Sequence, residues 1–165
     1  MNTSLTTVRG TTQTIATLTL TREIEVRDMG EYAGHDRSVR VPAGTYEIKA
    51  TIDWRSPYVY IAFAGSLVRN TWNGRPTGGE KPGDVAEVKS HVYIYSVCRA
   101  AAGKDTGALY GGKVTIADGW SIDPVDDGAL VAPTGELIAL STSIRADEVP
   151  AYRERMAAHL AKQAS

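Results

Sequence analysis

The chain has 165 residues, of which 42% are hydrophobic and 22% charged, and its formal net charge is −1. This balance is ordinary for a globular protein and gives no overall field that would draw the chain to nucleic acid or to an anionic membrane. The single cysteine, Cys98, excludes an internal disulfide and a metal site built from several thiolates of one chain. We expect one domain, residues 1–165, with no cofactor and no metal.

Two further features of the sequence concern its location. No apolar run reaches the roughly 18 residues that a membrane-spanning helix needs. The first residues lack the basic-then-apolar order of a secretion signal. Both features predict a cytoplasmic protein that does not contact a membrane.

The N-terminal part of the chain is expected to be an arm followed by strands. Residues 1–13 are polar and rich in threonine, which indicates a loose arm. Residues 14–27 alternate apolar and polar side chains, as in a β-strand with one buried face. Arg22 interrupts the apolar face, where a charge can protect a strand edge, mark a bend or hold an anionic ligand. Arg22 is therefore a candidate contact residue, although edge protection or a bend is the simpler explanation. Val39 and Val41 begin another strand.

Residues 45–63 carry the clearest pattern in the chain. Apolar residues recur at every second position from Tyr46 to Trp54, and polar residues fill the places between them. Pro57 then interrupts the run, and residues 58–64 are apolar on both faces. We therefore predict a β-hairpin at the centre of the sheet, with its second strand buried on both sides. Residues 67–68 are expected to extend that second strand.

Residues 69–84 contain four glycines and two prolines, which predicts a long loop with a turn at Asn73-Gly74. Trp72 and Arg75 within this loop are candidate contact residues.

Residues 85–99 alternate again and predict a strand, with His91, Tyr93 and Tyr95 on one face. Side chains of this kind can form a platform for a ligand, and cross-strand packing explains them equally well. Residues 100–102, three alanines, predict a short helical turn.

Residues 107–113, GALYGGK, match the GxxxxGK spacing of a phosphate-binding loop. That loop needs a Ser or Thr after the lysine to bind magnesium, and a helix whose N-terminus faces the phosphate. Val114 occupies the hydroxyl position and begins a predicted strand, so we expect a glycine-rich turn that binds no nucleotide. Strands are expected at 113–117, 130–131 and 137–144.

Asp123, Asp126 and Asp127 make an acidic, turn-rich segment. Calcium prefers several oxygen ligands close together. The spacing differs from the alternating aspartate loop that binds calcium, and no glutamate follows in the twelfth position. We therefore expect a solvated turn.

Only residues 147–163 predict a long helix, with Asp147 as its N-cap. The apolar stripe on this helix consists of Val149, Tyr152, Met156 and Leu160. We expect the stripe to pack across the sheet, and pairing with a second subunit is the alternative.

Candidate catalytic residues are few. His35, His91 and His159 are far apart in the sequence and match no zinc-binding spacing. His35 and Asp36 can act as a general-base pair only beside a nucleophile. Cys98 has no identifiable histidine partner.

Taken together, these patterns predict an α+β, mainly β domain: an antiparallel sandwich or open barrel with one C-terminal amphipathic helix. The expected function is that of a non-catalytic binding or assembly protein, a homo-oligomer that contacts a protein partner or small ligand through glycine-rich loops and Tyr and Trp surfaces. One alternative is a small hydrolase that uses His35, Asp36 and the acidic turn 123–127. Another is a nucleic-acid binder working through residues 69–81, against which the slightly acidic chain argues.

Overall fold

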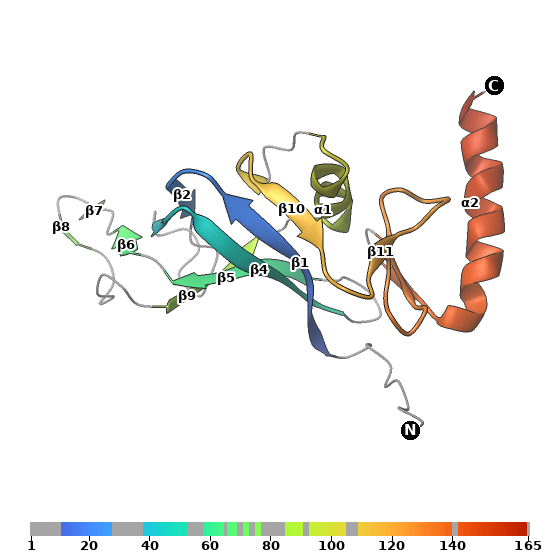
Figure 1. The fold of residues 1–165 in the computed structure, drawn as a ribbon, viewed down its shortest axis with the longest axis horizontal. Coiled ribbons are helices and arrows are strands. Elements are labelled where there is room, and N and C mark those ends of the chain that lie inside the picture. Colours follow the sequence, from blue (N-terminus) through green and yellow to red (C-terminus); the bar gives the residue numbers. More distant parts are fainter. Residues whose placement is uncertain are drawn as a thin grey trace.

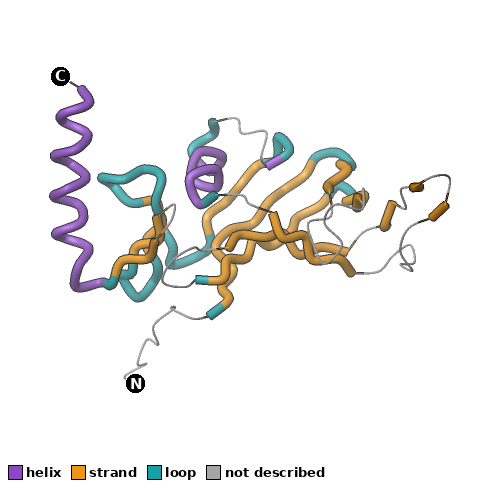
Figure 2. Tube along the Cα trace, turned by 180° about the vertical axis from the view of Figure 1, so that it is seen from behind, coloured by secondary structure: helices purple, strands orange, loops and turns teal. Residues whose placement is uncertain are grey.

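The computed structural model describes residues 11–27, 38–52, 58–64, 66–68, 71–72, 75–76, 85–90, 93–104, 109–139 and 142–164. Figure 1 shows these parts of the chain as ribbons, and Figure 2 shows them from behind. The elements in chain order are β1 Thr12–Leu20, β2 Ile24–Arg27, β3 Ser38–Val41, β4 Gly44–Thr51, β5 Tyr58–Ala64, β6 Ser66–Val68, β7 Thr71–Trp72, β8 Arg75–Pro76, β9 Val85–Ser90, α1 Ile94–Ala101, β10 Lys113–Ile116, β11 Ser121–Ile122, β12 Leu130–Val131, β13 Leu137–Ala139, β14 Thr142–Ile144, the 3₁₀ turn η2 Ala146–Glu148, and α2 Val149–Ala164.

The largest sheet has five antiparallel strands in the order β10-β1-β4-β5-β9. The hairpin predicted within 45–63 is confirmed: β4 lies at the centre of this sheet and pairs with β5, with Ile48 opposite Ile61. Trp54 and Pro57 lie outside the described residues. The burial of β5 on both faces stays a prediction, because its side chains are also outside the described set.

The two faces of the central strands differ as their alternation predicts. Leu18 of β1, Ile48 of β4 and Val114 of β10 are buried in one hydrophobic core together with α1. The opposite face is polar, and cross-strand threonine hydroxyls meet on it: Oγ1 of Thr19 lies 3.3 Å from Oγ1 of Thr45. Over β1, β4 and β10 the sheet is thus apolar on one side only, and α1 lies against β10 as part of the layer that covers this side (Figure 1).

The strand predicted over 85–99 is confirmed for Val85–Ser90, and residues 91–92 lie outside the described residues. Ile94–Ala101 form helix α1 instead, and Ile94, Val97 and Cys98 are its buried residues. The spacing i, i+3, i+4 places these three on one helical face, and the alanines that follow favour helix over strand. Tyr93 therefore precedes a helix and Tyr95 lies on it, so the predicted strand-face platform is wrong.

The strand predicted over 14–27 also divides. β1 ends at Leu20 and β2 starts at Ile24 in a separate three-stranded sheet, β2-β3-β6. Arg22 is exposed at the bend between them, as the simpler explanation of the break predicts, and its role as a contact residue stays a prediction. Residues 67–68 do not extend β5 in its sheet, because β6 pairs with β3.

A second, four-stranded sheet follows in the order β11-β12-β13-β14. The strand predicted over 137–144 is two antiparallel strands, β13 and β14, and β11 was not predicted. A small second cluster of buried residues lies here, formed by Ala129, Leu137, Ala139 and Val149. Val149 carries the start of α2 onto this sheet.

The predicted C-terminal helix is confirmed, but two of its details are wrong. Asp147 is not a side-chain cap: Arg145 precedes η2 with no side-chain capping hydrogen bond, and the Asp147 carboxylate pairs with Arg145 at 3.1 Å. The apolar stripe packs only at its beginning, because Val149 and Tyr152 join the second cluster whereas Leu160 is 42% exposed. Beyond its first turns α2 stands apart from the sheets in both views (Figures 1 and 2).

The α+β, mainly β, antiparallel class is confirmed, with α1 as an additional helix. The sheets formed by the described strands do not close into a barrel. Within the same parts of the chain, every helix is too short or too polar to cross a bilayer.

Gly112, at the entry to β10, offers a test of the core packing. A Cβ added there would overlap Cδ1 of the buried Leu18 and lie 3.1 Å from the carbonyl oxygen of Thr19. We expect Gly112→Ala to lower the free energy of unfolding by about 1–3 kcal/mol, because overpacking forces the core to shift. Urea denaturation measures the change, and Lys113→Ala at the exposed neighbouring position should alter it by less than about 0.5 kcal/mol. Equal stabilities for the two variants would contradict this packing role.

Candidate functional site

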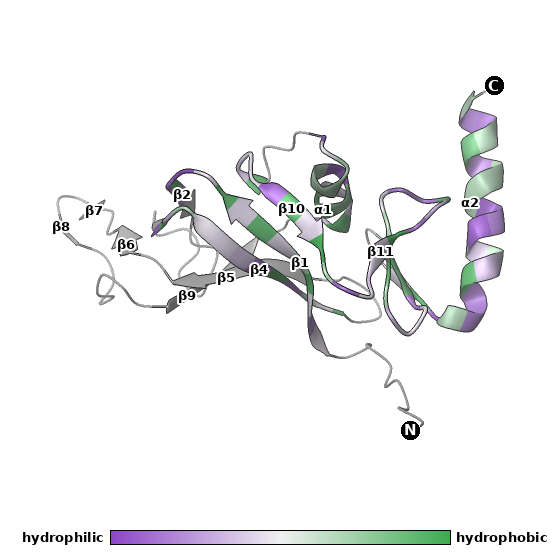
Figure 3. Cartoon of the chain, in the orientation of Figure 1, coloured by the Kyte–Doolittle hydropathy of each residue, from purple (hydrophilic) through white to green (hydrophobic). Residues whose placement is uncertain are grey.

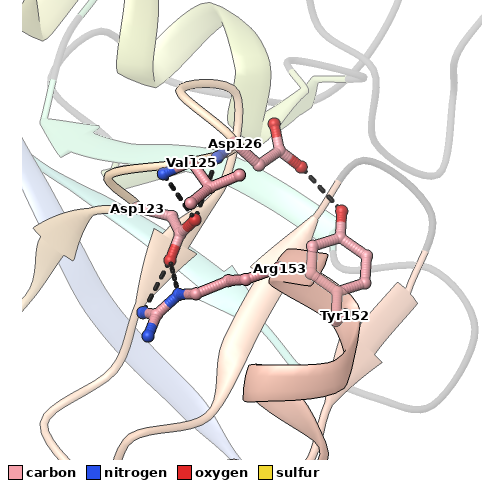
Figure 4. Close-up of polar contacts among 5 residues, drawn as sticks. All are labelled: Asp123, Val125, Asp126, Tyr152 and Arg153. Atoms are coloured by element: carbon pink, nitrogen blue, oxygen red, sulfur yellow. Dashed lines mark hydrogen bonds and ion pairs between the residues drawn. The ribbon is translucent and has the colours of Figure 1, made fainter. Parts of the chain in front are cut away.

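The acidic turn and the start of α2 are joined by a connected cluster of polar contacts (Figure 4). Its centre is Asp123, whose side chain is completely buried. Oδ2 of Asp123 accepts the backbone N–H groups of Val125 at 3.1 Å and Asp126 at 2.9 Å. Oδ1 accepts both Nε and Nη2 of Arg153, each at 2.7 Å. Both oxygens are thus satisfied, as a buried carboxylate requires.

Asp126 makes a second connection between the same two segments. Its Oδ2 accepts a hydrogen bond from the hydroxyl of Tyr152 at 2.6 Å, and its Oδ1 accepts the backbone N–H of Gly128 at 3.1 Å. Burial, the hydrogen bond to Asp126 and the negative charges of Asp126 and Asp123 raise the pKa of Tyr152 well above its ordinary value. Tyr152 therefore remains a protonated donor throughout the neutral range. We call Asp123, Asp126, Tyr152 and Arg153 the clamp.

The clamp corrects the expectation of a solvated turn. Asp123 is only 2% exposed and Asp126 is half-buried, whereas Asp127 alone among the three carboxylates is exposed. Within the described parts of the chain, no group of three or more His, Cys, Asp or Glu residues is arranged to hold a metal ion. The clamp therefore has a structural role: it holds the first two turns of α2 against the acidic turn that follows β11.

Helix α1 reaches the same turn through Tyr95. A Cβ on Gly128 would lie 3.0 Å from Cδ2 of Tyr95, so the ring rests directly against the turn backbone. Nη1 of Arg99 donates to the Tyr95 hydroxyl at 2.8 Å, and its guanidinium lies 5.3 Å from the ring centroid. Tyr95 is still 45% exposed, and Tyr93 is 56% exposed. The two tyrosines thus lie at the surface beside the turn.

Cys98 is buried on the inner face of α1. Burial, and then the negative charges of Asp126 and Asp127, raise the pKa of the Cys98 thiol to about 12. A thiol in this state is a poor nucleophile at neutral pH.

The other predicted site residues lie mostly outside the described part of the chain. Trp72 and Arg75 pair through their backbones in the two-stranded sheet β7-β8, and their side chains lie outside the described residues. His35, Asp36 and His91 also lie outside the described residues. Arg22 lies at the exposed bend between β1 and β2.

Sequence reasoning located the acidic turn but missed Arg153 and Tyr152 as its partners. One available signal was the Asp-Pro-Val-Asp pattern, which favours a turn closed by an aspartate side chain on the backbone two and three residues later. Another was a cation in the first turns of an amphipathic helix, next to its apolar stripe. Neither signal identifies which carboxylate that cation meets.

Comparisons with known proteins add no relative: no protein-family model, curated protein or solved structure matches this chain.

Arg153→Met tests the clamp, because it leaves the Asp123 carboxylate buried without its counter-charge. We expect a loss of about 3 kcal/mol in the free energy of unfolding, reduced from the fully buried case because the Arg153 side chain is 35% exposed. Urea denaturation measures the loss, and Arg155→Met, an exposed arginine of the same helix, is the matched control. Asp123→Asn combined with Arg153→Met should cost less than the two single changes summed. Strict additivity would show that the two side chains are not coupled.

The raised pKa of Cys98 has its own test. At about pH 8 the folded chain should react with a thiol reagent far more slowly than the urea-unfolded chain. Above an ordinary thiol pKa of about 8.5, the unfolded chain loses a proton that the folded chain keeps, so stability should fall as the pH rises toward the folded value. The stability difference between the parent chain and Cys98→Ala should therefore shrink as the pH is raised from neutral. A constant difference across that range would contradict a raised pKa.

Proposed function

We propose that this chain is a non-catalytic binding or assembly protein whose main contact element is α2. One observation carries the proposal: the apolar stripe of α2 is only half used by the fold. Val149 and Tyr152 pack in the second cluster, whereas Met156 is half-buried and Leu160 is 42% exposed. An apolar stripe that continues beyond the fold is typical of a helix that binds another surface.

The clamp supports the proposal because it holds α2 in a defined direction. Arg153 and Tyr152 tie the beginning of the helix to a buried carboxylate and its turn. The rest of α2 contains good helix formers, including Ala157, Ala158 and Ala161. A contact element that is ordered before binding loses less conformational entropy when its partner arrives.

Tyr93 and Tyr95 support a second contact area beside the acidic turn. Exposed tyrosines combine apolar area with a polar hydroxyl and are enriched at protein interfaces. The Arg99 guanidinium against the Tyr95 ring holds that ring in one position. The participation of Trp72 and Arg75 rests on the sequence alone.

The clamp geometry also favours binding over catalysis at the acidic turn. A general base or metal ligand needs a lone pair that a substrate or ion can reach, and both oxygens of Asp123 are occupied within the chain. The hydrolase alternative therefore loses Asp123 and depends on His35, Asp36 and the exposed Asp127. The nucleic-acid alternative depends on residues 69–81. Both stay predictions from the sequence.

Leu160→Ser and Val149→Ala form a matched pair that tests whether the outer stripe belongs to the fold. At sub-micromolar protein concentration we expect Leu160→Ser to change the free energy of unfolding by less than about 0.5 kcal/mol, because its side chain is 42% exposed and belongs to neither buried cluster. Val149→Ala should cost about 2 kcal/mol, because two buried methyl groups and their contacts are lost. Urea denaturation of both variants provides the comparison. A similar loss in the two variants would make Leu160 a core residue and remove the basis of the proposal.

A further inference from the structure

We draw no further inference here: the strongest candidate, the surface patch of the exposed Tyr93 and Tyr95 where α1 meets the acidic turn (α1 is labelled in Figure 3), carries none, because nothing in the structure shows what covers it.

Discussion

The C-terminal third of this protein depends on one constraint: the carboxylate of Asp123 is removed from water and must be fully compensated. Two backbone N–H groups and the Arg153 guanidinium supply that compensation. The same contacts determine the shape of the acidic turn and the position at which α2 begins. Tyr95 rests on the closed turn, so α1 is linked to the same feature. A buried charge whose partner comes from another element specifies how the elements meet, because no other arrangement satisfies it.

Much of the fold followed from residue alternation, and its failures have physical causes. The two-residue period of β4 was sufficient to predict the strand. One face of β4 is exposed to solvent, so polar residues alternate with apolar ones along its sequence. The helix at 94–101 was missed because Ile94, Val97 and Cys98 form a helical face, whereas Tyr93 and Tyr95 alternate with their neighbours as residues of a strand do. The bend at Arg22 was visible as a break in the pattern. That β2 then joins a different sheet depends on pairing with β3, which no local pattern contains.

The candidate site was predictable only in part. The aspartates and the amphipathic helix were both recognised, yet their meeting was not, because Arg153 follows Asp123 by 30 residues and only the fold brings them together. The stripe on α2 was also recognised, and packing across the sheet was the natural expectation for it. The second cluster has only four buried residues, Ala129, Leu137, Ala139 and Val149. It is therefore too small to cover more than the first turns of α2. Leu160, at the outer end of the stripe, therefore remains 42% exposed.

The order of the large sheet has a consequence for how the chain folds. β1 forms its edge contact with β10, and Thr17 pairs with Thr115, about a hundred residues later. During synthesis the β4–β5 hairpin and the β1–β4 pair are complete long before β10 leaves the ribosome, so one edge of β1 waits with unpaired backbone groups. Until β10 is made, those backbone groups can pair with a strand of a neighbouring chain, and the arrival of β10 closes that edge.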